Sequence, residues 1–255
     1  MRIWATSDLH ADFAENRQLL EQLSDEYYQR DILIIAGDIA DRMAIIEANL
    51  QLLKRKFAQI CYVPGNHEFW VRGDYEHSLT KFEAILDLCA QLGIVTKPLC
   101  VESHWIVPLF SWYETSFDIN EPTDNQELEG WADYHLCRWP TALDQPLNYF
   151  LELNNPHIQK YDLPVISFSH FLPRRELLPP VEYLRFKSLY RVAGSTALDQ
   201  QVRSINSTTH IFGHSHINWD ETIAGVRYIQ NALSYPKERR RYPRPTIKQI
   251  WPSLL

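Results

Sequence analysis

The sequence predicts an α/β fold, because short apolar runs alternate along it with longer amphipathic ones. The first third reads strand–helix–strand–helix–strand–helix, which is typical of parallel strands joined by right-handed crossovers. The end of the chain reads strand–turn–strand, which predicts that part of the sheet is antiparallel. We therefore expect mixed β-sheet flanked by helices.

The individual elements follow from composition and periodicity. Short runs rich in Ile, Val and aromatic residues are expected to be strands: Arg2–Thr6, Ile32–Ala36, Gln59–Val63, Trp105–Phe110, Pro164–Phe168, Thr208–Phe212 and Val226–Ile229. Runs with helical periodicity are expected to be helices: Glu15–Gln29, Ala44–Lys56, Tyr75–Leu92 and Ser195–Ser204. The last of these follows Gly194, and Ser195 is its expected N-cap.

Residues 112–160 are an aromatic-rich excursion with few periodic patterns. It contains Trp112, Tyr113, Trp131, Tyr134 and Trp139. Long loops in compact domains are often functional, whereas aromatic rings usually bury themselves. The excursion is therefore expected either to rim a site or to pack over the core.

A basic tail at residues 237–255 contains Arg239, Arg240, Arg241 and Arg244. Such a run can be an interaction arm, but a short run in an acidic chain favours a solvated surface. We interpret residues 1–255 as a single domain that carries both the excursion and the tail.

Composition and charge limit the classes of function. The 255 residues are 45% hydrophobic, enough for one sizeable core, and the formal net charge is −7. An acidic chain argues against binding to nucleic acid or to an anionic membrane. No signal peptide, no apolar run of about 18 residues and no Cys-x-x-Cys pair is visible. We therefore expect a cytoplasmic protein with reduced cysteines, and the oligomeric state stays open.

Five apolar strands end on side chains of the types that bind metals. The polar residues that follow them are Asp8-Leu9-His10, Asp38, Asn66-His67-Glu68, His170 and His214-Ser215-His216. Ligands of open α/β sheets gather at the carboxyl ends of strands, so these five ends can converge on one crevice. Gly37, Gly65 and Gly213 directly precede three of these polar segments, where glycine permits a sharp turn and a close backbone approach.

The candidate donors are two carboxylates, one amide and four imidazoles: Asp8, Asp38, Asn66, His10, His170, His214 and His216. A set without thiolates disfavours a structural zinc site and suits Mn²⁺, Fe, Zn²⁺, Co²⁺ or Ni²⁺. Because so many ligands exceed the needs of one catalytic ion, two divalent metal ions about 3.5–4 Å apart fit better. Their positive charge outweighs the two carboxylates and favours a phosphorylated substrate.

Together these segments resemble the five ordered motifs of the calcineurin-like metallophosphoesterase superfamily. The motifs are Asp8-x-His10, Gly37-Asp38-x-x-Asp41, Gly65-Asn66-His67-Glu68, His170 and Gly213-His214-x-His216. The resemblance covers most of the chain, and five motifs in the right order are a strong signal although each alone is not. It implies two packed mixed β-sheets flanked by helices, a four-layer α/β/β/α sandwich.

The resemblance also implies residue roles. Asp8, His10 and His216 would hold one metal ion; Asn66, His170 and His214 would hold the other; Asp38 would bridge both. Asn66 and His67 would contact the phosphate, His67 would protonate the leaving oxygen, and Asp41 would orient His67 or support the ligands. The implied activity is hydrolysis of a phosphate mono- or diester by a metal-bridging hydroxide, on a phosphorylated small molecule or a phosphoprotein.

Several of these interpretations have alternatives. Arg174 and Arg175 follow His170 closely enough to reach a substrate phosphate, as Arg42 also can, but each is equally well explained as solvated surface. Asn66 can cap a helix as well as bind a metal. Two other functions stay open: a non-catalytic scaffold of the same fold, which usually lacks some ligands, and a nuclease, which the acidic balance disfavours.

Overall fold

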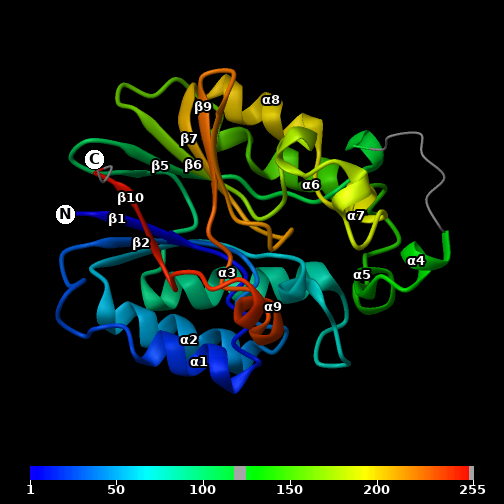
Figure 1. The fold of residues 1–255 in the computed structure, drawn as a ribbon, viewed down its shortest axis with the longest axis horizontal. Coiled ribbons are helices and arrows are strands. Elements are labelled where there is room, and N and C mark those ends of the chain that lie inside the picture. The colour runs from blue at the N-terminus through cyan, green and yellow to red at the C-terminus, as the bar shows by residue number, and fades with distance from the viewer. Residues whose placement is uncertain (118–124, 253–255) are drawn as a thin grey trace.

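Two β-sheets pack face to face, and helices cover the outer face of each (Figure 1). The computed structural model describes residues 1–117 and 125–252. One sheet has the strand order β10-β1-β2-β3 and the other the order β4-β5-β6-β7-β9-β8. The strands are β1 (Ile3–Thr6), β2 (Ile32–Ala36), β3 (Gln59–Val63), β4 (Leu99–Cys100), β5 (Trp105–Pro108), β6 (Val165–Phe168), β7 (Ser207–Phe212), β8 (Trp219–Ile223), β9 (Val226–Gln230) and β10 (Lys248–Trp251).

The long helices form the two outer layers. The helices are α1 (Ala14–Glu21), α2 (Met43–Lys56), α3 (Ser78–Leu92), α4 (Asn125–Glu129), α5 (Ala132–Leu136), α6 (Pro146–Leu153), α7 (Leu189–Val192), α8 (Thr196–Ser204) and α9 (Pro236–Arg241). Helices α1, α2 and α3 cover the first sheet, and α8 covers the second (Figure 1). The expected four-layer α/β/β/α architecture is therefore confirmed.

The central strands are buried on both faces because each face meets another layer. In β2 all five residues are buried. Ile34 lies between the sheets with Ile166, whereas its neighbour Leu33 packs toward Leu50 of α2. A strand with two apolar faces reads as a continuous apolar run, which is why β2 was visible in the sequence.

The strand directions bring one set of strand ends together. Strands β1, β2 and β3 are parallel, and so are β5, β6, β7 and β9. Strands β8 and β10 are antiparallel to β9 and β1. The carboxyl ends of β1, β2, β3, β6 and β7 therefore open on the same side, where ligand sites of such sheets form.

Two expected helices are shorter in the structure. Helix α1 ends at Glu21 rather than at Gln29, because the Ser24 hydroxyl accepts the backbone N–H of Glu26 (3.3 Å) and of Tyr27 (3.1 Å). Such side-chain bonds offer the backbone an alternative to the helix. Helix α3 begins at Ser78 rather than at Tyr75.

Ser195 is the N-cap of α8, as predicted. Its side-chain oxygen accepts the N–H of Ala197 at 3.0 Å, which satisfies one of the free donors in the first turn of the helix.

The basic tail is solvated only in part: Arg240 and Arg241 are exposed, as expected, whereas other parts of the tail pack against the fold. It folds into α9 and into β10, which pairs with β1. Arg239 donates to the side-chain oxygen of Asn16 at 2.5 Å, and Arg244 donates to the Ser234 hydroxyl at 2.7 Å. Long-range pairing of this kind leaves no trace in a local pattern of charge.

The aromatic-rich excursion both packs and reaches the site. Trp112 is only 4% exposed and belongs to the core between the sheets. Asp133, in α5, accepts a hydrogen bond from Asn66. The excursion therefore does both things that the sequence offered as alternatives: part of it packs in the core and part of it contacts the site.

Two further expectations concern membrane-spanning helices and the cysteines. No helix in the described ranges is long and apolar enough to cross a membrane. Cys61, Cys89, Cys100 and Cys137 are all free thiols, as the sequence predicted.

Candidate metal centre

The seven candidate donors meet between the carboxyl ends of five strands. Asp8 and His10 follow β1, Asp38 follows β2, Asn66 follows β3, His170 follows β6, and His214 and His216 follow β7. All of them except His216 are buried, and the His216 side chain is 13% exposed. The strand ends thus enclose a cluster of nitrogen and oxygen donors almost out of contact with water.

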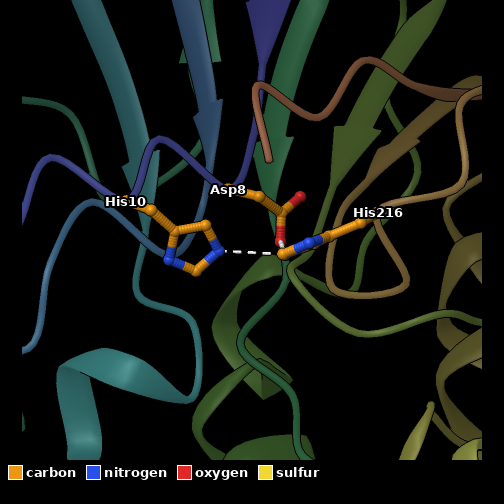
Figure 2. Close-up of side chains that lie close together, drawn as sticks. All are labelled: Asp8, His10 and His216. Atoms are coloured by element: carbon orange, nitrogen blue, oxygen red, sulfur yellow. Dashed lines mark hydrogen bonds and ion pairs between the residues drawn. The ribbon is translucent and has the colours of Figure 1, made fainter. Parts of the chain in front are cut away.

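Asp8, His10 and His216 form one group of donors (Figure 2). The Nε2 atoms of His10 and His216 lie 2.9 Å apart, and His216 Nε2 is 3.4 Å from Asp8 Oδ1. The other nitrogen of His216, Nδ1, lies 2.7 Å from the carboxylate of Glu238 in α9. A carboxylate behind an imidazole fixes the ring and leaves the far nitrogen free to bind a metal.

Asn66, His170 and His214 form a second group. The side-chain oxygen of Asn66 lies 3.0 Å from His170 Nε2 and 3.0 Å from His214 Nδ1. The far nitrogen of each ring donates to a backbone carbonyl, of Ala36 for His170 and of Val192 for His214, at 2.9 Å in both cases. In neutral imidazoles the two facing nitrogens then carry lone pairs, so three acceptor atoms meet without a proton to share. A cation would resolve that conflict.

Asp38 lies between the two groups. Its Oδ1 is 3.5 Å from His170 Nε2, and its Oδ2 is 4.0 Å from His10 Nε2. It takes part in two sets of donor atoms that all lie within 4.8 Å of one another, one with His10 and His67 and one with Asp8 and His170. One carboxylate therefore faces both groups.

The electrostatics of the cluster fit cation binding. Burial and the neighbouring His216 hold the pKa of His10 well below its ordinary value, and burial does the same for His214. Burial also opposes charge on His216, yet Asp8 and Glu238 together raise the pKa of this imidazole to about 9. Metals bind the deprotonated ring, so these two neutral imidazoles are ready to ligate and the proton of His216 is the one a cation would displace.

Glu68 holds two of the strand ends together. Its fully buried carboxylate accepts backbone N–H groups from Ile39 at 2.6 Å, Gly65 at 2.7 Å, Asp38 at 3.0 Å and Ala40 at 3.4 Å. These donors come from the turns after β2 and β3. Glu68 belongs to the third motif but has no role that its sequence context predicts, and this bridge between the two turns supplies one.

His67 lies at the edge of the donor cluster. Its Nε2 is 3.8 Å from Asp38 Oδ2, its ring lies against Trp70 with centroids 3.7 Å apart, and its side chain is 12% exposed. The hydroxyl of Tyr235 lies 3.4 Å from the same Nε2, and its ring stacks on His10. His67 thus joins the buried donors to the part of the site open to solvent.

Five of the candidate donors have a left-handed backbone: Asp8, His10, Asp38, His214 and His216, with φ between 41° and 72°. This region is uncommon for residues other than glycine, although Asn, Asp and His tolerate it best. Gly37 shares it with φ 84°, whereas Gly65 is needed for close approach, because a Cβ there would lie 2.2 Å from Asp38 Oδ1. The turns that aim these side chains are therefore strained, as at many functional sites.

Four other sequence candidates lie in contacts of their own. The Asp41 carboxylate pairs with Arg72 at 2.7 Å, and among the described interactions none joins its carboxylate to His67, so the expected orienting contact is not seen. Arg42 has a 73% exposed side chain beside Asp41.

Arg174 is engaged by Asp199 at 2.8 Å and by Glu176 at 2.5 Å. It lines, with Arg175, a cavity of about 290 Å³ formed with Ser116 and Thr196. The acidic partners neutralise Arg174, and the position of Asp199 in the distant helix α8 could not be read from the sequence.

Three residues that sequence reasoning missed contact the donor cluster. Asp133 bonds Asn66, Glu238 bonds His216, and Arg244 donates to the backbone carbonyl of His216 at 3.0 Å. They come from the excursion and the tail, where no motif marks them. Only contacts across the folded chain identify them.

Comparison with known proteins places this architecture in a family. The family model described as calcineurin-like phosphoesterase matches residues 1–218. The chain belongs to the calcineurin-like phosphoesterase family. As a member it is a phosphoesterase, and its buried His and Asp clusters are candidate metal-binding groups.

Individual members of the family resemble the whole chain. The [acyl-carrier-protein] phosphodiesterase PptH of Mycobacterium tuberculosis is 29% identical over 98% of this chain and 83% of its own length. The crystal structure of that phosphopantetheinyl hydrolase superposes with a TM-score of 0.83 at 26% identity, covering 99% of this chain and 96% of the other. A more distant solved structure, at 12% identity and a TM-score of 0.51, covers 91% and 90% and shows the fold alone.

Proposed function

We propose that this calcineurin-like phosphoesterase is a dinuclear metal-dependent hydrolase of phosphodiesters. One ion would be held by Asp8, His10 and His216, the other by Asn66, His170 and His214, and Asp38 would bridge them. The observation that carries the proposal lies in the second group, where Asn66 Oδ1 is 3.0 Å from a ring nitrogen of His170 and 3.0 Å from one of His214, so that three lone pairs meet. The first group, with Asp8, lies beside it. The family implies a pair of ions, and this donor set fits Mn²⁺ as well as Fe, Zn²⁺, Co²⁺ or Ni²⁺.

The chain's own residues would perform the remaining steps. When bound, two divalent ions supply a hydroxide nucleophile and stabilise the charge that develops on the phosphate. His67 would protonate the leaving oxygen, because it lies beside Asp38 and its side chain is partly open to solvent. Asn66 and His67 would contact the phosphate, and Trp70, whose ring lies against the imidazole, would hold His67 in place. Asp41, which pairs with Arg72, would act on His67 only indirectly.

For the substrate we propose a phosphodiester that joins a phosphopantetheine arm to a carrier protein. The support is the PptH relative, whose printed names are acyl-carrier-protein phosphodiesterase and phosphopantetheinyl hydrolase and which matches almost the full chain. The four free cysteines agree with a cytoplasmic location, where such a thiol-bearing arm stays reduced. A smaller phosphorylated molecule is the alternative within the same chemistry.

The test is a substrate panel on protein loaded in turn with each of the five metals. We expect turnover of an aryl phosphodiester above that of the monoester, and conversion of a phosphopantetheinylated carrier protein to its unmodified form, seen by intact mass. Chelator and the Asp38→Asn variant should abolish both reactions.

Two results would contradict the proposal. Hydrolysis of monoesters alone would exclude the diester assignment. No turnover on any phosphoester, with fewer than two ions per chain by elemental analysis, would favour the scaffold.

A further inference from the structure

Asp133 is a buried carboxylate that the motifs do not include. It lies in α5, is 3% exposed, and receives three side-chain N–H groups. Oδ1 accepts from Asn66 Nδ2 at 2.9 Å and from Trp70 Nε1 at 2.6 Å, and Oδ2 accepts from Trp131 Nε1 at 2.9 Å. The carboxylate thus links one candidate metal ligand, Asn66, to the indole rings of Trp70 and Trp131.

The contact with Asp133 fixes which end of the Asn66 amide faces the donor cluster. An amide has nearly the same shape in either orientation, but only its NH₂ can donate to a carboxylate, which accepts and does not donate. With Nδ2 held by Asp133, Oδ1 points at His170 and His214, 3.0 Å from each. In the flipped orientation an amide nitrogen without a free lone pair would face the cation, and an oxygen would face the carboxylate.

We propose that Asp133 is a positioning residue that selects the metal-binding orientation of Asn66 and so sets the affinity of the ion held with His170 and His214. The inference rests on the proposed dinuclear function. It extends that function to the aromatic-rich excursion, which supplies Asp133 from 67 residues away along the chain. Partners of metal ligands commonly change metal affinity by 10- to 100-fold when they are replaced.

The decisive experiment compares three variants by calorimetric titration of the metal-free protein, with elemental analysis of bound ions. Asp133→Leu keeps a similar size but removes the acceptor that Asn66 needs, so we expect one ion to bind about 10- to 100-fold more weakly and the other to bind normally. Trp131→Phe is the matched control, since it removes another donor from the same carboxylate. It should leave both affinities within about threefold of the wild type.

The third variant exchanges the two partners. In Asn66→Asp/Asp133→Asn the new amide can donate to the new carboxylate, whose second oxygen still faces His170 and His214. We expect this double variant to regain two ions. A purely structural role, in which Asp133 anchors Trp70, predicts no rescue, because the new amide nitrogen that donates to residue 66 also faces Trp70 Nε1 and cannot accept from it.

The outcomes separate cleanly. If the wild type binds two ions and Asp133→Leu binds both equally well, or if the folded exchange variant stays weak, the positioning role is overturned. If the wild type itself binds fewer than two ions, the dinuclear proposal fails first.

Should Asp133→Leu not fold, a crystal structure of the metal-loaded wild type decides. It must show Asn66 Nδ2 bonded to Asp133 and Oδ1 on the ion; any other partner for Nδ2 overturns the inference.

Discussion

Replacing Glu68 with Gln should destabilise the protein even though the side chain hardly changes size. The Glu68 carboxylate accepts four backbone N–H groups in a fully buried position. Oε1 serves Ile39 and Ala40, whereas Oε2 serves Asp38 and Gly65. A glutamine offers one oxygen and one NH₂, so two of the four backbone donors would face another donor.

The magnitude follows from those distances. Whichever way the glutamine lies, it loses one of the two shortest bonds, 2.6 Å to Ile39 or 2.7 Å to Gly65. A buried donor left unsatisfied costs about 1–3 kcal/mol, so two of them should lower the free energy of unfolding by about 2–6 kcal/mol. For a chain of this size that corresponds to a melting temperature lower by about 4–24 °C.

Urea unfolding of the metal-free protein measures this loss without a contribution from bound ions. The control is Glu47→Gln on the exposed face of α2, where Glu47 accepts a hydrogen bond from Gln51 at 3.1 Å. We expect that control to stay within about 0.5 kcal/mol of the wild type. If Glu68→Gln also lies within that margin, the two turns do not depend on the Glu68 bridge and the reasoning is refuted.

Three other perturbations have definite expected outcomes. Burial lowers the pKa of His210 to about 3, so below about pH 6.5 the unfolded chain takes up a proton at this residue while the folded chain does not. The free energy of unfolding should therefore fall by about 2 kcal/mol from pH 8 to pH 5, as measured by denaturant unfolding at each pH. The His210→Gln variant should show a smaller dependence on pH. Removing the carboxylate behind His216 by Glu238→Ala should weaken metal binding about 10- to 100-fold in calorimetry, with Glu238→Gln, which can still accept from Nδ1, closer to the wild type. A Cβ added by Gly65→Ala would lie 2.2 Å from Asp38 Oδ1. This variant should therefore lose at least about 1–3 kcal/mol of stability in thermal unfolding, and it should bind fewer metal ions. Wild-type stability together with wild-type metal content would contradict the close approach.

The sequence predicted most of the strands and the donor cluster because both depend on local pattern. An apolar run followed at once by Asp8, or by Gly37 and Asp38, already contains the strand, the turn and the side chain at its end. The parallel strand order then brings the ends together without further information. The end of α1 was missed because a single hydroxyl, that of Ser24, competes with the helix.

What the sequence could not supply are the partners of the donors. Asp133 and Glu238 belong to segments that looked aromatic-rich or merely basic, and their importance depends on contacts with Asn66 and His216 made only in the folded chain. The partner of Arg174 was also hidden from the sequence: this residue stands near His170 along the chain, but Asp199 of α8 pairs with it. Proximity along the chain predicts side-chain partners poorly when the sheet order is not sequential.

The pairing of β10 with β1 has a consequence for synthesis on the ribosome. The first strand to emerge receives one of its two neighbours only when residues 248–251 have been made, since Ile3 is in register with Trp251. Glu238 and Arg244, which contact His216, also follow the last motif along the chain. A nascent chain that has already exposed every motif is therefore still an incomplete enzyme, with a sheet edge open to wrong pairing until the last strand arrives.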